Sequence, residues 1–180
     1  EQIPWIFSFL VDELGLDPKR MYVTCFKGTK EIPKDTESAA IWKEEFAKRG
    51  IDAKEVENPE SGEEGRIFYY DAQKNWWSRQ GAPENMPIGE PGGPDSEIFY
   101  EFDQEHDPEF GEKCHPNCEC GKYLEIANSV FMEFKKVGEG EFEPLPEKNV
   151  DFGGGLERMA MAASESTDIF EIESFKNAVG

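Results

Sequence analysis

The sequence lacks a surplus of basic residues, a long hydrophobic run and a secretion signal. Its 180 residues include 19 Lys and Arg against 39 Asp and Glu, which gives a formal net charge of −20. Because nucleic-acid binding depends on basic surfaces, the chain by itself should repel DNA and tRNA. The same charge disfavours anionic membrane surfaces, and no apolar run is long enough to span a bilayer. These absences predict a cytoplasmic protein without a membrane or DNA partner.

The signatures of common hydrolases are also missing. There is no P-loop, no HEXXH helix and no Ser/His/Asp pattern. The two histidines, His106 and His115, are nine residues apart, which is too far for an HxxxH pair. The chain begins at Glu1 without a Met and enters a helical pattern at once. We therefore expect a segment of a longer protein, and not a hydrolase.

Composition and patterning predict a folded α+β domain. Hydrophobic residues make up 37% of the chain and aromatic residues 13%, enough for a core at this length. Helical spacing predicts helices at residues 4–14, 36–49 and 168–178. Apolar, β-branched and aromatic runs predict strands at residues 21–26, 66–71, 96–102, 123–136 and 141–145. Long, irregular connectors between the strands favour an antiparallel or mixed β-sheet flanked by helices over regular βαβ units.

The stretch Asn149 to Ala163, NVDFGGGLERMAMAA, has the pattern of a short strand, a glycine turn and a helix. A helix N-terminus exposes unpaired N–H groups and the positive end of the helix dipole, so this junction is suited to an anion. Asp151 precedes the glycines, and Arg158 lies in the first turns of the helix. One could hold an ammonium group and the other a phosphate. Alternatively, the stretch is a tight turn with a surface ion pair.

Two other places could belong to a binding pocket. Trp76 and Trp77 precede a Gly- and Pro-rich segment, 80–94, that we expect to form an ordered loop. Neighbouring residues of a strand point to opposite faces, so one Trp could be core and the other line a site, or both could be core. Asn128 lies in an otherwise apolar strand, where its amide must find internal partners or face a pocket.

Three of the four cysteines lie within one CHPNCEC segment: Cys114, Cys118 and Cys120. With His115 inside this segment and His106 upstream, the segment could hold a structural tetrahedral zinc ion. We predict Cys114, Cys118, Cys120 and His115 as its ligands. The C-x3-C-x-C spacing differs from the common C-x2-C pair, so reduced thiols are the alternative. The fourth cysteine, Cys25, stands in a strand-like run and is expected in the core.

Four segments, taken in order, resemble the aminoacylation domain of the alanyl-tRNA synthetase family. They are NWW (75–77), EPGGPDSEIFY (90–100), YLEIANSVFMEF (123–134) and NVDFGGGLERMAMA (149–162). The earlier segments FLVDELGLDPKRMYVTCFKG and EIPKDTESAAIW match the same family in the same order, so the resemblance covers nearly the whole chain. It implies a single partial aminoacylation domain over residues 1–180, with a Cys-rich loop at 103–121. The family belongs to the class II synthetases, whose catalytic fold is an antiparallel sheet flanked by helices.

The resemblance implies a part of an alanine–tRNA ligase, which activates alanine with ATP and Mg²⁺ to alanyl-adenylate and transfers it to tRNA(Ala). It implies that Arg158 is the catalytic arginine of motif 3 and contacts the ATP phosphates. Gly153 and Gly155 would let the backbone lie close to the adenylate. The alanine site would combine a carboxylate for the ammonium group with walls for the side chain: Asp151, Trp77, Asn128 and Val130. The tRNA would be bound only through regions outside this chain.

The sequence departs from the family pattern in two places. Phe152 and Gly154 stand where the family usually has Thr and Met, and Gly92 and Asp95 replace two loop cysteines. Nothing in the chain matches class II motifs 1 and 2, and motif 2 supplies the arginine that stabilises charge on the α-phosphate. We therefore expect the chain alone not to form alanyl-adenylate. The alternative is a non-catalytic, zinc-stapled interaction or regulatory module derived from the same fold.

Overall fold

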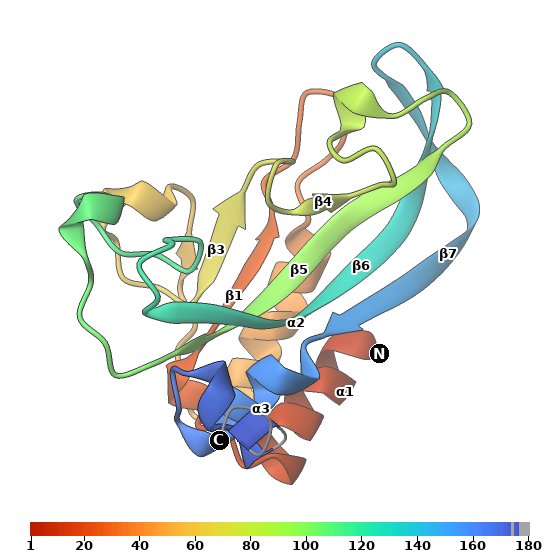
Figure 1. Cartoon of the computed structure of the whole chain (residues 1–180). Coiled ribbons are helices and arrows are strands. Elements are labelled where there is room, and N and C mark those ends of the chain that lie inside the picture. Colours follow the sequence, from red (N-terminus) through yellow and green to blue (C-terminus); the bar gives the residue numbers. More distant parts are fainter. Residues whose placement is uncertain (174, 177–180) are drawn as a thin grey trace.

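The structure is a computed structural model that describes residues 1–173, 175 and 176. Figure 1 shows a twisted β-sheet that runs through the molecule, with helices packed below and behind it in this view. The sheet has seven strands among the described residues, in the order β2–β3–β1–β5–β6–β7, and β4 pairs with β5 beside this path. The strands are β1 (Met21–Phe26), β2 (Glu55–Val56), β3 (Ile67–Tyr70), β4 (Trp76–Trp77), β5 (Pro91–Glu101), β6 (Tyr123–Gly138) and β7 (Glu141–Gly154).

The strand directions make the sheet mixed. β1 and β2 each pair with β3 in parallel. The pairs β1–β5, β4–β5, β5–β6 and β6–β7 are antiparallel. The predicted α+β class, with a largely antiparallel sheet and flanking helices, is therefore confirmed.

Three α-helices are described: α1 (Gln2–Ser8), α2 (Thr36–Lys48) and α3 (Leu156–Ser164). α1 continues into a π-helical turn at Phe9–Glu13, so the first predicted helix is present with a widened last turn. Asp35 caps α2, because its Oδ1 accepts a hydrogen bond from the Ser38 N–H at 2.9 Å. α1 and α2 bury an aromatic cluster in the main core: Phe7, Trp42 and Phe46. Burial of each ring stabilises the fold by about 1.5–3 kcal/mol.

Two glycine-rich segments differ from the prediction. Gly153 and Gly154 do not form a turn but are the last residues of β7, and only Gly155 remains as the N-cap of α3. Gly153 pairs with Asn128 of β6, because a glycine backbone joins a β ladder like any other. The expected loop at 80–94 ends early, since β5 already begins at Pro91.

The predicted helix at 168–178 is described only in part. Its start forms a 3₁₀ turn at Ile169–Glu171. Residues 174 and 177–180 lie outside the described part of the chain. In the part that is described, no helix is long and apolar enough to cross a bilayer.

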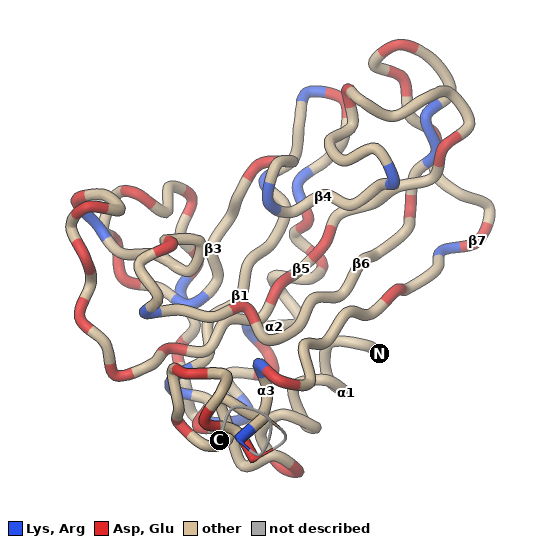
Figure 2. Tube along the Cα trace, in the orientation of Figure 1, with Lys and Arg blue, Asp and Glu red and all other residues tan. Residues whose placement is uncertain are grey.

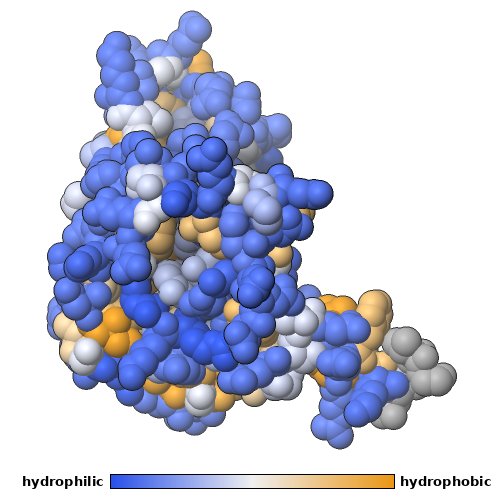
Figure 3. All heavy atoms as spheres, turned by 90° about the vertical axis from the view of Figure 1, so that its left-hand side faces the viewer, coloured by the Kyte–Doolittle hydropathy of each residue, from blue (hydrophilic) through white to orange (hydrophobic). Residues whose placement is uncertain are grey.

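The two long connectors, residues 51–65 and 103–121, are polar. Figure 2 shows Asp and Glu along both of them, at the left of the view. Figure 3 looks onto that side and shows a mostly hydrophilic face with small hydrophobic patches. Neither hydrophobic cluster of the described residues includes a side chain from 103–121. This loop therefore needs another means of holding its shape.

Candidate functional site

The register of β5, β6 and β7 arranges the predicted site residues in two adjacent rows across the sheet. Directly paired residues of neighbouring strands share a face of the sheet. One row contains Glu97, Asn128 and Gly153. The other row contains Asp95, Val130 and Asp151. Three residues predicted for the alanine site thus lie side by side. Two carboxyl groups that were not predicted as site residues, those of Asp95 and Glu97, complete the rows.

Trp77 and Asp151 line the same open cavity, which has a volume of about 650 Å³. The two tryptophans lie in different environments, as strand alternation allows. Trp76 is 5% exposed and belongs to a small core cluster, whereas Trp77 is 39% exposed. Asp151 is exposed, and its Oδ1 accepts a hydrogen bond from the Phe152 N–H at 2.9 Å. An aromatic wall beside an exposed carboxylate suits a small molecule with an apolar group and a positive charge.

Arg158 lies in the first turn of α3, and its guanidinium reaches back to β6. Its Nη1 donates to the main-chain oxygen of Glu125 at 3.0 Å and to the Glu125 carboxylate at 3.3 Å. The Arg158 side chain is half-exposed, so this ion pair adds little stability and can be exchanged for another anion. Among the described residues no ion pair joins Arg158 to Asp151, so the surface pair considered from the sequence is not formed.

The glycines before α3 let neighbouring side chains approach the backbone closely. A Cβ at Gly153 would lie 2.5 Å from Asn128 Oδ1, which is closer than real Cβ contacts. The three atoms nearest to a Cβ at Gly155 all belong to the Arg158 side chain, with its Cδ at 3.0 Å. Gly155 also donates its N–H to the main-chain oxygen of Ile126 at 3.1 Å, which ties the end of β7 to β6. The side chains of Asn128, Met159 and Arg158 therefore pack closely against the backbone from 153 to 155, where an added Cβ would crowd them.

A buried polar network lies beside the two rows. Thr24 Oγ1 donates to Glu97 Oε2 at 2.9 Å and accepts from Asn75 Nδ2 at 2.7 Å. Asn75 Nδ2 also lies 3.0 Å from Asp95 Oδ1. Burial, and then the charge of Glu97, raises the pKa of Asp95 to about 8. Burial, and then the charge of Glu125, raises the pKa of Glu97 to about 7. Both carboxyl groups therefore retain a proton close to neutral pH.

The 103–121 loop brings three thiols and one imidazole together: His106, Cys114, Cys118 and Cys120. Their ligand atoms all lie within 4.8 Å of one another, so the group could bind a metal ion. His115, the histidine of the predicted ligand set, is not in this group. Its Nδ1 lies 2.8 Å from the Tyr70 hydroxyl instead. Adjacency in the sequence favoured His115, but the fold of the loop turns it away and brings His106 in. Cys25 is fully buried in the core, as predicted.

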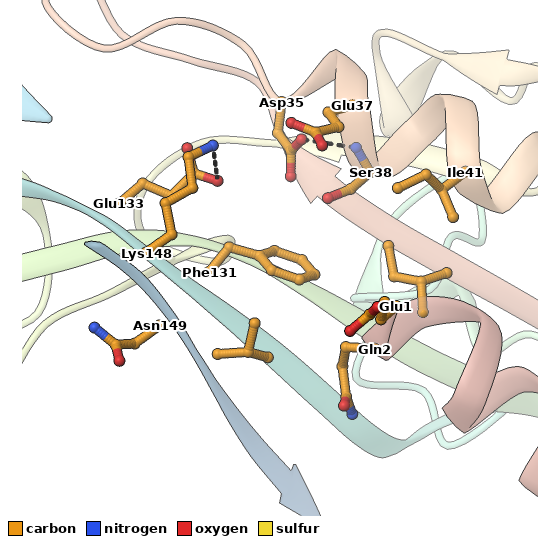
Figure 4. A pocket seen from close by; sticks show the side chains of 12 residues that line it. Glu1, Gln2, Asp35, Glu37, Ser38, Ile41, Phe131, Glu133, Lys148 and Asn149 are labelled. Atoms are coloured by element: carbon orange, nitrogen blue, oxygen red, sulfur yellow. Dashed lines mark hydrogen bonds and ion pairs between the residues drawn. The ribbon is translucent and has the colours of Figure 1, made fainter. Parts of the chain in front are cut away.

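A second cavity lies away from these rows, on the side of the sheet that α1 and α2 cover. Figure 4 shows its lining residues, among them the Glu133–Lys148 ion pair at 3.1 Å and the Asp35 cap on Ser38. Its volume is about 250 Å³. None of the residues predicted for the alanine, ATP or metal sites lines this cavity, so it is not the candidate site.

Comparison with known proteins gives one family for almost the entire chain. The family described as "tRNA synthetases class II (A)" matches residues 1–179. The alanine–tRNA ligase of Treponema denticola is 35% identical over 183 residues, which cover 99% of this chain and 26% of that protein. The alanine–tRNA ligase of Treponema pallidum is 35% identical over 97% of this chain and 25% of that protein. That of Latilactobacillus sakei is 36% identical over 97% of this chain and 17% of that protein. The chain thus spans about a quarter or less of the curated relatives it matches.

Proposed function

Because this chain belongs to the class II tRNA synthetases, we propose that it contributes part of the alanine and ATP site of an alanine–tRNA ligase. The observation that supports this most strongly is the shared face of β6 and β7, which carries Asn128, Val130 and Asp151 in adjacent rows. Trp77 lines the same cavity as Asp151, and Arg158 approaches the same strands from α3. These are the groups that an amino acid and a nucleotide need together.

In this proposal Asp151 binds the ammonium group of alanine through charge-assisted hydrogen bonds. Trp77 and Val130 form the walls of the space for the alanine methyl group. Burial of this methyl group contributes about 0.8 kcal/mol to binding. Asn128, whose amide has room because residue 153 is a glycine, lines the same site. Its amide can donate to the carboxylate of alanine.

ATP would lie beside the start of α3. Arg158 would exchange the Glu125 carboxylate for phosphate oxygens, which suit its planar, bidentate guanidinium. Gly153 and Gly155 carry no side chain of their own, which would let the adenylate approach the backbone closely. The family uses ATP with Mg²⁺, and the carboxylate of Glu125 beside Arg158 is the kind of hard oxygen ligand that this ion prefers. Bound there, Mg²⁺ would neutralise charge on the phosphates.

The reaction proposed for the whole enzyme has two steps. An alanine carboxylate oxygen attacks the α-phosphorus of ATP in line, the bond to pyrophosphate breaks, and alanyl-adenylate forms. A terminal ribose hydroxyl of tRNA(Ala) then attacks the alanyl carbonyl, and AMP leaves. Asp151 orients the nucleophile and Arg158 stabilises charge on the phosphates in the first step. The tRNA would be bound through regions outside this chain, because a net charge of −20 opposes a polyanion.

Replacement of Asp151 tests the alanine site. Asp151→Asn preserves size but removes the charge that would hold the ammonium group. In the full-length protein we expect calorimetry with a non-hydrolysable alanyl-adenylate analogue to show binding at least about tenfold weaker, because such a hydrogen bond is worth about 1.5–3 kcal/mol. Asp52→Asn, at an exposed acid on the 51–65 connector, should bind like the wild type. Equal affinities for Asp151→Asn and Asp52→Asn would exclude Asp151 from the site.

A further inference from the structure

The thiol and imidazole group of the 103–121 loop has the dimensions of a metal site. Cys114 Sγ lies 3.6 Å from Cys120 Sγ, and Cys118 Sγ lies 3.7 Å from His106 Nδ1. With Zn–S near 2.3 Å and Zn–N near 2.0–2.1 Å, a tetrahedral zinc ion requires about 3.8 Å between sulfurs and about 3.6 Å between sulfur and nitrogen. These two separations are close to the required values, and all four ligand atoms lie within 4.8 Å of one another. They are far longer than the S–S bond of a disulfide, which is about 2.05 Å.

The second nitrogen of His106 supports the same conclusion independently. His106 Nε2 lies 2.9 Å from the main-chain oxygen of Gly111. A carbonyl oxygen can only accept, so Nε2 carries the hydrogen and the neutral ring presents the lone pair of Nδ1 to the thiols. Metal-bound histidines are usually oriented by such a hydrogen bond from the outer nitrogen to a carbonyl or carboxylate. The loop therefore fixes the tautomer that a metal at Nδ1 requires.

We propose that His106, Cys114, Cys118 and Cys120 form a closed, structural zinc site that holds the 103–121 loop in its folded shape. Three thiolates and one imidazole in a tetrahedral arrangement favour Zn²⁺ over hard cations such as Mg²⁺ or Ca²⁺. Four protein ligands leave no open position for water or substrate, so the ion has a structural role. The polar loop contributes no side chain to either hydrophobic cluster, so metal binding replaces the missing core.

The zinc loop also touches the network beside the candidate site. Asn117, next to Cys118, donates its Nδ2 to Glu97 Oε2 at 3.4 Å and its main-chain N–H to the Tyr70 hydroxyl at 3.3 Å. Glu97 pairs directly with Asn128 in the sheet. By holding the loop, zinc fixes the position of the Asn117 side chain that donates to Glu97. Glu97 is the end residue of the row that includes Asn128. This second part of the proposal rests on the proposed alanine and ATP site, whereas the zinc site itself does not.

Metal analysis tests the zinc site without reference to activity. Protein purified without added zinc should contain an equimolar amount of zinc. Replacement of that zinc by Co²⁺ should produce thiolate-to-cobalt charge-transfer absorption and the strong visible bands of a tetrahedral site. Sub-stoichiometric zinc, with the three loop thiols all reacting at once with a thiol reagent, would overturn the proposal.

A matched pair of histidine variants tests the ligand set. His106→Asn should weaken zinc binding by at least about tenfold, since even outer partners of a metal site contribute that much. His115→Asn should keep the wild-type zinc affinity, because His115 contacts Tyr70 and not the thiols. Circular dichroism at matched zinc concentrations confirms that both variants are folded. Equal zinc affinities in the two variants would exclude His106, and Cys114→Ser provides a second ligand variant with the same expected loss.

Asn117→Ala tests the link to the candidate site. This variant should keep equimolar zinc but bind the alanyl-adenylate analogue several-fold more weakly, because Glu97 loses one of its partners. Zinc retention together with wild-type binding of the analogue would refute the link and leave the zinc site standing. If the wild-type protein itself fails to bind the analogue, the proposed function is what fails, and the zinc content still decides the metal site.

Discussion

The Asp95 carboxyl group is 5% exposed, and its pKa is raised to about 8 by burial and by the charge of Glu97. In an unfolded chain the same group loses its proton near pH 4. Between about pH 4 and pH 8 the folded chain therefore binds more protons than the unfolded chain. The contribution of Asp95 to stability is greatest at the acidic end of this window and falls as the pH rises.

Asp95→Asn should flatten this fall in stability, because Asn cannot ionise and its Oδ1 can still accept from Asn75 Nδ2. Urea unfolding midpoints measured between about pH 5 and pH 8 provide the test. The variant should gain stability relative to the wild type as the pH rises, whereas Asp52→Asn, at an exposed site, should follow the wild type. Parallel wild-type and Asp95→Asn curves would show that Asp95 does not titrate in this window.

Sequence pattern predicts single residues well where strand alternation decides their environment. Alternation indicated that one of the two adjacent tryptophans could be open to a cavity, and Trp77 is. Pattern could not choose correctly between His106 and His115, because that choice depends on how the loop between them folds. It also did not reveal the burial of Asp95 and Glu97, although acidic residues at alternate positions of a strand were a signal that one face is polar.

At the scale of elements, β5 and β6 approach each other more closely at Gly93 than a side chain permits. A Cβ at Gly93 would lie 1.8 Å from the main-chain oxygen of Phe131. The pairing register shifts between Gly92 and Asp95, which marks an irregularity of the β-bulge type. This close approach is adjacent to Trp77, which pairs with Gly93.

Gly93→Ala should destabilise the protein by about 3 kcal/mol or more, because the added methyl group must displace backbone and not a flexible side chain. Gly155→Ala is the matched control, since its φ is −78° and the atoms nearest to its Cβ belong to the flexible Arg158 side chain. We expect that control to change stability by less than about 1 kcal/mol. Urea denaturation of both variants measures the difference, and similar midpoints would contradict the close approach of β5 and β6.

Element centres were predictable, and element ends were not. The runs MYVTCF and TESAAIWKEEFAK carry their own periodicity, so β1 and α2 match the prediction within one or two residues. β7 extends to Gly154 because, beyond a register shift, residues 127–132 of β6 pair with residues 149–154. That extent depends on a partner strand, and the local glycine pattern indicated a turn instead.

At the scale of the whole molecule, strand order is the part that sequence could not supply. Composition and connector lengths predicted an α+β fold, which is observed. The parallel pairing of β1 and β2 with β3 joins segments that are distant in the chain, and local patterns contain no information on such pairs. Local patterns could not assemble the candidate site either, because its residues come from β4, β6, β7 and α3. From the sequence, only the resemblance of ordered segments to one family predicted that these residues belong together.

We infer that this chain forms part of an alanine-activating site in which Arg158 contacts the phosphates. Alanine-dependent exchange of labelled pyrophosphate into ATP by the full-length protein is the most direct measurement. Wild type and Asp52→Asn should exchange equally, and Arg158→Gln should be slower by about 10²–10³-fold, the usual effect of losing one preorganised donor to the transition state. The 180-residue chain alone should stay at background, because no motif 2 arginine is present in its sequence. Wild-type exchange rates in Arg158→Gln would contradict the claim.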